Sequence, residues 1–343
     1  MVRKSNNCCL SIVIFVFPAL VIYFNFSSGG PGSTPRTDGR YRHSRHEGQI
    51  QEPINWTAEN DKMAARMTLR LRTLKENCDR FGLSSASNDS LHRPNPWEFL
   101  INRQYGLVWC NVFKAASSSW LFNFNVLAGY SPQFLRRQSQ APVLSLARRK
   151  YPRPSLHDLE SAISAPSSVS FVIVRHPFER LLSAYRDKIY NSLPNTIHRA
   201  LSSAILRKYR PLAVTKSTSR RATFEEFVLY LLDTFRSNET GLDMHWAPVV
   251  QFCTPCLINF NVILKFETLQ EDQRYLIELT GLSHLIKPEW INEGKGGSTN
   301  QMIGKFYSEL SADQLYQLYN VYKYDFELFD YTMEEYLEYV RYP

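Results

Sequence analysis

The sequence predicts an α/β fold in which a mostly parallel sheet is flanked by helices. Residues 106–127 have the pattern of a buried strand, a polar turn and a helix, and residues 169–188 repeat that order. A third stretch, residues 258–266, alternates apolar with polar side chains and indicates another strand. Strands that alternate with helices favour a parallel sheet with helices on both faces. A ligand of such a sheet is expected at the carboxyl ends of the strands.

The first two strands each end in a turn that carries a cation. Lys114 opens a turn, residues 114–119, that also holds three serines, and Arg175 stands two residues before Pro177, which suits a first helical position. Backbone N–H groups and the helix dipole make such turns anion sites, so the pair predicts a ligand with two separated anionic groups. Taken alone, Lys114 also fits a solvated turn lysine, and its turn lacks the glycines of the nucleotide-triphosphate loop.

Other helices are predicted from local patterns. Thr223 and Glu226 have the spacing of a capping box and precede an apolar helical face. Ser311 opens a last helix, again with an apolar face. Residues 61–77 carry a third helical pattern, which fits either a coiled coil in a stem or a helix at the edge of the domain.

The N-terminal region predicts a membrane anchor. Residues 10–26 are almost wholly apolar and follow Arg3 and Lys4, which indicates a short spanning helix with a cytosolic N-terminus. The alternative is a cleaved signal peptide. Residues 27 to about 60 are rich in Gly, Ser, Pro and Arg, as flexible stems are. The predicted organisation is a cytosolic tail (1–9), a signal anchor (10–26), a lumenal stem (27–94) and a catalytic domain (95–343).

Cysteines and glycosylation sequons agree with a lumenal domain. Sequons begin at Asn55, Asn88 and Asn238. Four cysteines follow the anchor, and they allow three disulfide pairings. The C-x-x-C at residues 253–256 lacks a second pair or nearby histidines, so a disulfide is favoured over zinc. The four are Cys78, Cys110, Cys253 and Cys256.

Basic residues exceed acidic ones, 40 against 32. They cluster at residues 148–150, 207–210 and 220–221, which suits a polyanionic acceptor, although each cluster also fits a solvated surface. Nucleic acid is the rival polyanion, and the predicted membrane anchor argues against it.

Two motifs resemble a known family. Residues 113–120 look like the 5′-phosphosulfate loop of Golgi carbohydrate sulfotransferases, and residues 175–186 look like their 3′-phosphate motif. The resemblance is greatest to the membrane-bound group of chondroitin and dermatan 4-O-sulfotransferases and covers roughly residues 100–332. Its further segments are residues 223–231, 245–246, 253–256, 265–269 and 318–329. The family usually has Pro at Phe113, and Cys or Thr near Ser117 and Ser118.

The resemblance implies a P-loop-like sulfotransferase fold and the donor 3′-phosphoadenosine 5′-phosphosulfate, with no metal. Lys114 is implied to stabilise the leaving phosphate, and Arg175 and Ser183 to hold the 3′-phosphate. The implied donor-binding residues are Phe113, Lys114, Ala115, Ala116, Ser117, Ser118, Ser119, Arg175, His176, Pro177, Phe178, Glu179, Arg180, Leu181, Leu182 and Ser183.

The acceptor hydroxyl needs a general base with a pKa near neutrality, which a histidine supplies. We predict His245 as this catalytic base; the alternative is a core histidine packed on Trp246. His176 is expected to be a helix-start residue, and Glu267 is the next candidate for the base. Residues 294–299 form a glycine-rich loop that either closes over the donor or lies on the surface.

Together these features predict a single-pass type II membrane enzyme of the Golgi with a lumenal catalytic domain. It would transfer sulfate to a sugar hydroxyl, at the 4-O position of N-acetylgalactosamine in a chondroitin- or dermatan-like chain. The expected partner is a glycan acceptor, a polyanionic glycosaminoglycan, and not nucleic acid. The alternatives are an acceptor on a glycoprotein glycan, a non-catalytic glycan-binding protein on the same scaffold, and a glycan kinase. The sequence predicts no oligomeric state.

Overall fold

The computed structural model describes residues 57–137, 143–210, 220–237, 241–288 and 299–342. The predicted cytosolic tail and signal anchor lie outside these ranges. No helix within the described ranges combines the length and the apolar character that a membrane span requires.

The sheet has four strands in the order β1-β2-β3-β4. β1 (Phe99–Asn102) pairs antiparallel with β2 (Leu107–Cys110), and β2, β3 (Val169–Val174) and β4 (Val262–Lys265) run parallel. The predicted mostly parallel sheet with helices is therefore confirmed for the described residues. Gly106 permits the turn into β2, because its φ is 62° and a Cβ there would lie 2.9 Å from the Ser167 carbonyl oxygen.

Two predicted strands are longer than the strands of the structure. β2 ends at Cys110 and β4 begins at Val262, whereas the pattern extended the first to residue 113 and began the second at residue 258. Ile258 and Phe260 are nevertheless buried. Val112 and Phe113 are buried as well. The apolar residues in both segments thus reflect burial in the core, and a buried segment need not pair as a strand.

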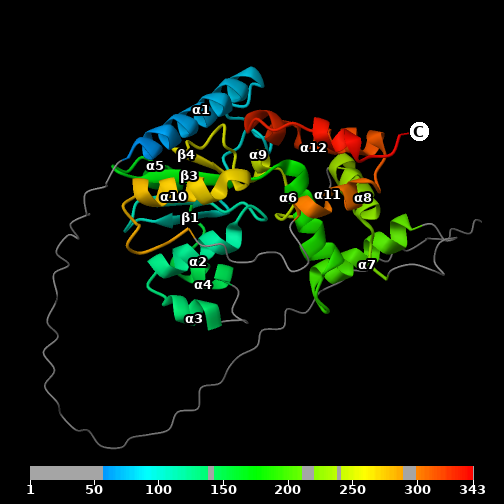
Figure 1. Cartoon of the computed structure of the whole chain (residues 1–343), viewed down its shortest axis with the longest axis horizontal. Coiled ribbons are helices and arrows are strands. Elements are labelled where there is room, and N and C mark those ends of the chain that lie inside the picture. Colours follow the sequence, from blue (N-terminus) through cyan, green and yellow to red (C-terminus); the bar gives the residue numbers. More distant parts are fainter. Residues whose placement is uncertain (1–56, 138–142, 211–219, 238–240, 289–298, 343) are drawn as a thin grey trace, which may run out of the picture. The chain divides into compact units, whose positions relative to one another are not determined.

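Helices on the sheet form the first core. α1 (Ala58–Arg80) packs on β4 and α10 (Leu269–Leu279), α5 (Leu156–Ile163) packs on β1 and β2, and α2 (Ser117–Leu127) packs on α4 (Val143–Lys150). Figure 1 shows α2, α4 and α3 (Pro132–Arg137) gathered together beside the sheet. Trp109, Trp120 and Phe171 meet at the centre of this core, with ring centroids of Trp120 and Phe171 4.7 Å apart.

A second core is made almost entirely by helices that follow β3. Its helices are α6 (Pro177–Ala184), α7 (Ile197–Tyr209), α8 (Phe224–Ser237), α11 (Ile303–Tyr307) and α12 (Ala312–Leu328), together with the 3₁₀ segments Asn300–Met302 and Glu334–Glu338. Figure 1 shows these helices as a group beside the sheet. α6 continues into a π-helix, Tyr185–Tyr190, so the predicted helix is present but changes its winding. α9 (Val249–Phe252) and the 3₁₀ segment Phe266–Thr268 pack against the first core instead.

Both predicted helix starts are confirmed. Thr223 Oγ1 accepts the Glu226 N–H at 3.1 Å, and Glu226 Oε2 accepts the Thr223 N–H at 2.8 Å, which completes a capping box before α8. Ser311 and Gln314 make the same reciprocal contacts before α12.

Two disulfides select one of the three possible pairings. Cys78 at the end of α1 bonds Cys256, and Cys110 at the end of β2 bonds Cys253. The bonds close loops across 178 and 143 residues, and disulfides that close long loops contribute about 2–5 kcal/mol each.

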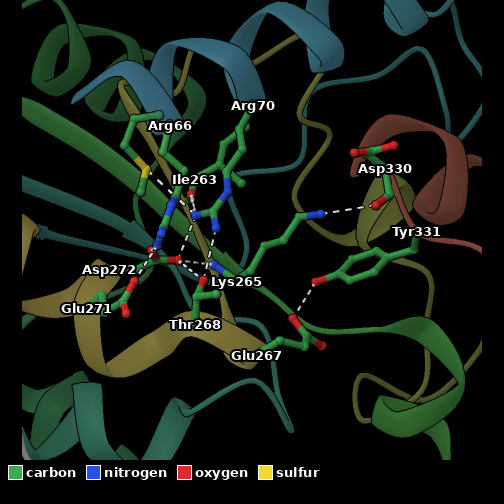
Figure 2. Close-up of polar contacts among 11 residues, drawn as sticks. Arg66, Arg70, Ile263, Lys265, Glu267, Thr268, Glu271, Asp272, Asp330 and Tyr331 are labelled. Atoms are coloured by element: carbon green, nitrogen blue, oxygen red, sulfur yellow. Dashed lines mark hydrogen bonds and ion pairs between the residues drawn. The ribbon is translucent and has the colours of Figure 1, made fainter. Parts of the chain in front are cut away.

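Helix α1 belongs to the domain and not to a separate coiled coil. Asp272, which is fully buried, accepts hydrogen bonds from Arg70 at 2.6 Å and Arg66 at 3.2 Å, both on α1 (Figure 2). Arg70 also donates to the Ile263 carbonyl at 2.8 Å, which fixes α1 to β4. Of the two alternatives for this helix, the structure has the one at the domain edge.

Candidate active site

The sheet brings the two predicted anion turns together. We call residues 114–119 the lysine turn and residues 175–177 the arginine turn. β2 and β3 are parallel neighbours, so their following turns emerge at the same edge. Arg175 Nη1 lies 3.4 Å from the Lys114 carbonyl oxygen and donates to it. The third parallel strand, β4, adds Phe266 and Glu267 at this edge.

The lysine turn has an unusual backbone. Lys114 and Ala116 have φ values of 68° and 57°, in the left-handed region that residues with a Cβ rarely adopt. Ala116 is the N-cap of α2 and its methyl group cannot accept a hydrogen bond. The N-terminus of α2 therefore has backbone donors and three serines with no acidic residue in its first turn, which favours an anion.

Lys114 reaches a carboxylate that the predicted site residues do not include. Its Nζ lies 2.9 Å from Asp187 Oδ2, and Lys188 Nζ lies 3.2 Å from the same oxygen. Burial lowers the pKa of Lys114, against the opposing effect of Asp187. Asp187 stands on the π-helix that extends α6. In the sequence, Asp187 was marked only by its place in the helical segment that follows the arginine turn.

Arg175 is held more tightly than Lys114. Its Nη2 donates to Glu179 Oε2 at 2.7 Å, and its guanidinium carbon lies 4.2 Å from the centroid of the Phe266 ring. The Arg175 side chain is only 7% exposed. Ser183 is half-buried one further turn along α6. This arrangement presents a guanidinium already oriented at the edge of the sheet.

His176 faces the second core. Its ring stacks on Tyr336 with centroids 4.7 Å apart, and its Nε2 lies 2.8 Å from the Thr332 carbonyl oxygen. Burial lowers its pKa, which favours the neutral imidazole. The backbone N–H of His176 donates to Glu267 Oε1 at 2.8 Å. Tyr331 donates to the other oxygen of Glu267 at 2.8 Å (Figure 2). Both oxygens of Glu267, the reserve candidate for the base, thus have structural partners.

Several residues of the predicted donor segment point away from the turn edge. Pro177, Phe178, Leu181 and Leu182 are buried, the last three in the second core. Arg180 is also buried, and its guanidinium donates to the carbonyls of His245, at 3.4 Å, and Ala247. These side chains support the fold around the turn, and Arg180 in particular holds the segment that carries His245.

His245 lies beside the lysine turn. Its ring centroid is 4.9 Å from that of Phe113, the residue before Lys114. Its Nδ1 lies 2.6 Å from Asp243 Oδ1, and its side chain is 14% exposed. The Trp246 ring lies farther away, at 6.5 Å, so His245 is packed mainly on Phe113 and not on that tryptophan.

The Asp243 contact sets the chemistry of His245. Burial raises the pKa of Asp243, but hydrogen bonds from the His245 ring and backbone outweigh it and bring the pKa to about 2. Burial lowers the pKa of His245 despite the same contact. An ionised carboxylate at Nδ1 favours the tautomer with its proton there, which leaves a lone pair on Nε2 to accept a proton.

Hydrogen bonds and a disulfide from residues far away in the sequence hold the backbone that follows His245. Tyr322 donates to the Trp246 carbonyl at 2.7 Å, and Asp325 accepts the N–H groups of Val249 and Val250 at 2.7 and 2.8 Å. The Cys110–Cys253 disulfide joins β2 to the same segment. Local spacing does not predict these contacts, because each partner comes from another helix or strand.

The basic clusters and the glycine-rich loop were also candidate parts of the site. In the basic clusters, Arg148 and Arg210 pair internally with Glu98 and Glu226, whereas Arg149 is exposed. The predicted loop at residues 294–299 lies outside the described residues except for its last residue.

His198, which no motif marked, places its Nε2 3.2 Å from Asp243 Oδ2.

Comparison with known proteins bears on the family of this chain. The model of the Sulfotransferase family matches residues 97–332. Mouse carbohydrate sulfotransferase 11 is 33% identical over 255 residues, which are 71% of this chain and 70% of the relative. The zebrafish protein of that name is 31% identical over 299 residues, 84% of this chain and 83% of the relative. Human carbohydrate sulfotransferase 9 is 30% identical over 76% of this chain and 58% of its own length. No solved structure gives a significant match.

Proposed function

Since this chain belongs to the sulfotransferase family, we propose that it sulfates the 4-O position of N-acetylgalactosamine in chondroitin- or dermatan-like chains. The chain is a carbohydrate sulfotransferase, an enzyme that transfers sulfate to a glycan, and the family uses 3′-phosphoadenosine 5′-phosphosulfate as donor. The finer acceptor assignment is supported by the resemblance of its motifs to the 4-O-sulfotransferases and by a net charge of +8.

The observation that carries the donor site is the adjacency of the two cationic turns. Lys114 stabilises the charge that develops on the leaving 5′-phosphate oxygen, together with the backbone and hydroxyls of residues 115–119. Arg175 and Ser183 hold the 3′-phosphate. Sulfuryl transfer runs in line between two oxygens, so positioning and charge stabilisation supply most of the catalysis.

His245 takes the proton of the acceptor hydroxyl at Nε2. Asp243 keeps the proton of the ring on Nδ1 and stabilises the imidazolium that forms. The ring lies beside Phe113, next to the lysine that receives the negative charge, so the base and the leaving-group cation act on opposite ends of one transfer. A positioned general base contributes about 10²–10⁴-fold to a rate.

The same proposal covers the place of the enzyme in the cell. Residues 10–26 anchor a type II protein in the Golgi membrane, and a stem leads from the anchor to the lumenal domain. The two disulfides support this placement, because such bonds persist in oxidising compartments.

Sulfate transfer from radiolabelled donor to a panel of desulfated glycans tests the acceptor. We expect label on desulfated chondroitin and dermatan, and 4-O-sulfated N-acetylgalactosamine after disaccharide analysis. Label on glycoprotein glycans alone would move the assignment to that acceptor class. Retention of the protein on a glycan without transfer to any acceptor would favour the non-catalytic alternative.

Replacement of His245 tests the base. His245→Gln should lower kcat by about 10²–10⁴-fold and leave retention on an immobilised 3′-phosphonucleotide unchanged, because the base does not hold the donor. His157→Gln, at an exposed histidine on α5, is the matched control. A folded His245→Gln protein with normal kcat would place the base elsewhere.

A further inference from the structure

Three potential metal ligands meet beside the lysine turn. His198 stands near the start of α7, and Asp243 and His245 precede α9. One ligand atom from each lies within 4.8 Å of the other two. Their side chains are 15%, 26% and 14% exposed, so the cluster is largely sheltered from water yet reachable from it.

The distances suit a small divalent ion. Asp243 lies between the histidines, with Oδ2 3.2 Å from His198 Nε2 and Oδ1 2.6 Å from His245 Nδ1. Zinc binds imidazole nitrogen and carboxylate oxygen at about 2.0–2.2 Å, so two ligand atoms on one tetrahedral ion lie about 3.3 Å apart. Small side-chain shifts would bring all three atoms onto one ion, and a water molecule would complete four-coordination.

We propose that His198, Asp243 and His245 bind a Zn²⁺-class ion and that this ion inhibits sulfate transfer. The binding follows from the ligand set, since two imidazoles and a carboxylate are typical of zinc sites. The inhibition rests on the proposed role of His245 as the base.

The inhibition has a direct chemical cause. Without metal, His245 donates its Nδ1 proton to Asp243 and has a free lone pair at Nε2. With metal, the Nδ1 lone pair binds the ion and the ring proton moves to Nε2, so His245 can no longer accept the proton of the acceptor hydroxyl. The ion therefore competes with a proton for one nitrogen and switches the tautomer of the base.

One positive side chain near the cluster pairs with a carboxylate. Lys188 acts on His245 through its charge, and its Nζ lies 3.2 Å from Asp187 Oδ2, which it shares with Lys114. The Phe113 ring packs on His245 from the side of the lysine turn and limits access of bulk water. Cys78, Cys110, Cys253 and Cys256 form disulfides, so their sulfur atoms are not free thiolates that would compete for the ion.

Direct metal binding tests the site without reference to activity. The full-length chain carrying Cys8→Ser and Cys9→Ser, which removes the two N-terminal thiols as ligands, is titrated with Zn²⁺ alone against a chromogenic chelator. His198→Gln should weaken binding at least about tenfold, because loss of even an outer-shell partner costs about 10–100-fold. His157→Gln should leave it unchanged. Equal zinc affinity in the His198→Gln and His157→Gln proteins would overturn the proposal.

Inhibition is measured as the ratio of rates with and without Zn²⁺ for each protein. The expected result is a zinc concentration for half-inhibition at least about tenfold higher for His198→Gln than for His157→Gln. Identical inhibition of the two proteins would overturn the regulatory claim. If His198→Gln loses zinc binding while His245→Gln transfers sulfate normally, the metal site stands and the assignment of the base fails.

Discussion

The lysine turn and the arginine turn hold their cations in different ways. Lys114 is 19% exposed and pairs with Asp187, whose side chain is 47% exposed. Arg175 is 7% exposed, pairs with Glu179 at 14% exposure and lies over the Phe266 ring. An ion pair with an exposed carboxylate contributes little and exchanges partners easily, whereas a desolvated guanidinium on an aromatic face keeps its orientation.

This contrast matches the two tasks that we propose. The cation at the leaving group must follow a charge that grows during the reaction, so an exchangeable partner such as Asp187 is suitable. The cation at the 3′-phosphate recognises a group that does not change, so a fixed guanidinium is better. We expect the two turns to respond differently to mutation.

The largest effects should come from removing each cation. Lys114→Ala should lower kcat by about 10²–10³-fold and lower the free energy of unfolding by less than about 1 kcal/mol, because its ion pair is partly exposed.

Arg175→Ala should raise the donor KM and lower the free energy of unfolding by up to about 3 kcal/mol, because it leaves Glu179 without its partner. Steady-state kinetics measures kcat and the donor KM of both variants, and thermal unfolding measures their free energies of unfolding.

Lys75→Ala is the matched control for the lysine turn. Lys75 pairs with Asp79 at 2.7 Å on the surface of α1, so its replacement removes a more exposed Lys–Asp ion pair outside the two cationic turns. If Lys114→Ala keeps normal kcat at saturating donor, the lysine turn does not stabilise the leaving group.

Arg175→Lys sharpens the comparison. A lysine keeps the charge but loses the planar fork and the contact with Phe266. We expect the donor KM to rise about ten- to a hundredfold with kcat little changed. A donor lacking the 3′-phosphate should bind wild type and variant equally; a difference between them would contradict the 3′-phosphate assignment.

Ser183→Ala should have a smaller effect. It removes one hydrogen bond to the 3′-phosphate from a half-buried position, so the donor KM should rise about two- to tenfold and the melting temperature should stay unchanged. An unchanged donor KM would limit the 3′-phosphate site to Arg175.

Asp187→Asn should give the smallest effect, a shift in the pH dependence. Burial already lowers the pKa of Lys114, and Asp187 opposes that shift. Without the carboxylate, the pKa of Lys114 falls further, so the ammonium loses its proton at lower pH and the alkaline limb of kcat/KM moves to lower pH. Asp79→Asn should leave this limb in place; an identical profile for Asp187→Asn and wild type would show that Lys114 is not coupled to Asp187.

Local patterns were enough for the elements that position the site. The strand and helix at residues 169–188 and the capping boxes before α8 and α12 follow from periodicity and short spacings, and the structure has them. Strand lengths were overestimated at residues 111–113 and 258–261, because apolar residues indicate burial in a core as well as pairing in a sheet.

The sequence by itself determined the α/β fold, the two cationic turns and a histidine beside a tryptophan as candidate base. Only the tertiary structure decided the disulfide pairing, the attachment of α1 to Asp272, the inward direction of Arg180 and the partners of Lys114, Arg175 and His245. Asp187 lies 73 residues from Lys114, and His198 lies 45 residues from Asp243. Local spacing determines periodicity and caps, whereas contacts of this range depend on how helices from two cores pack against one edge of the sheet.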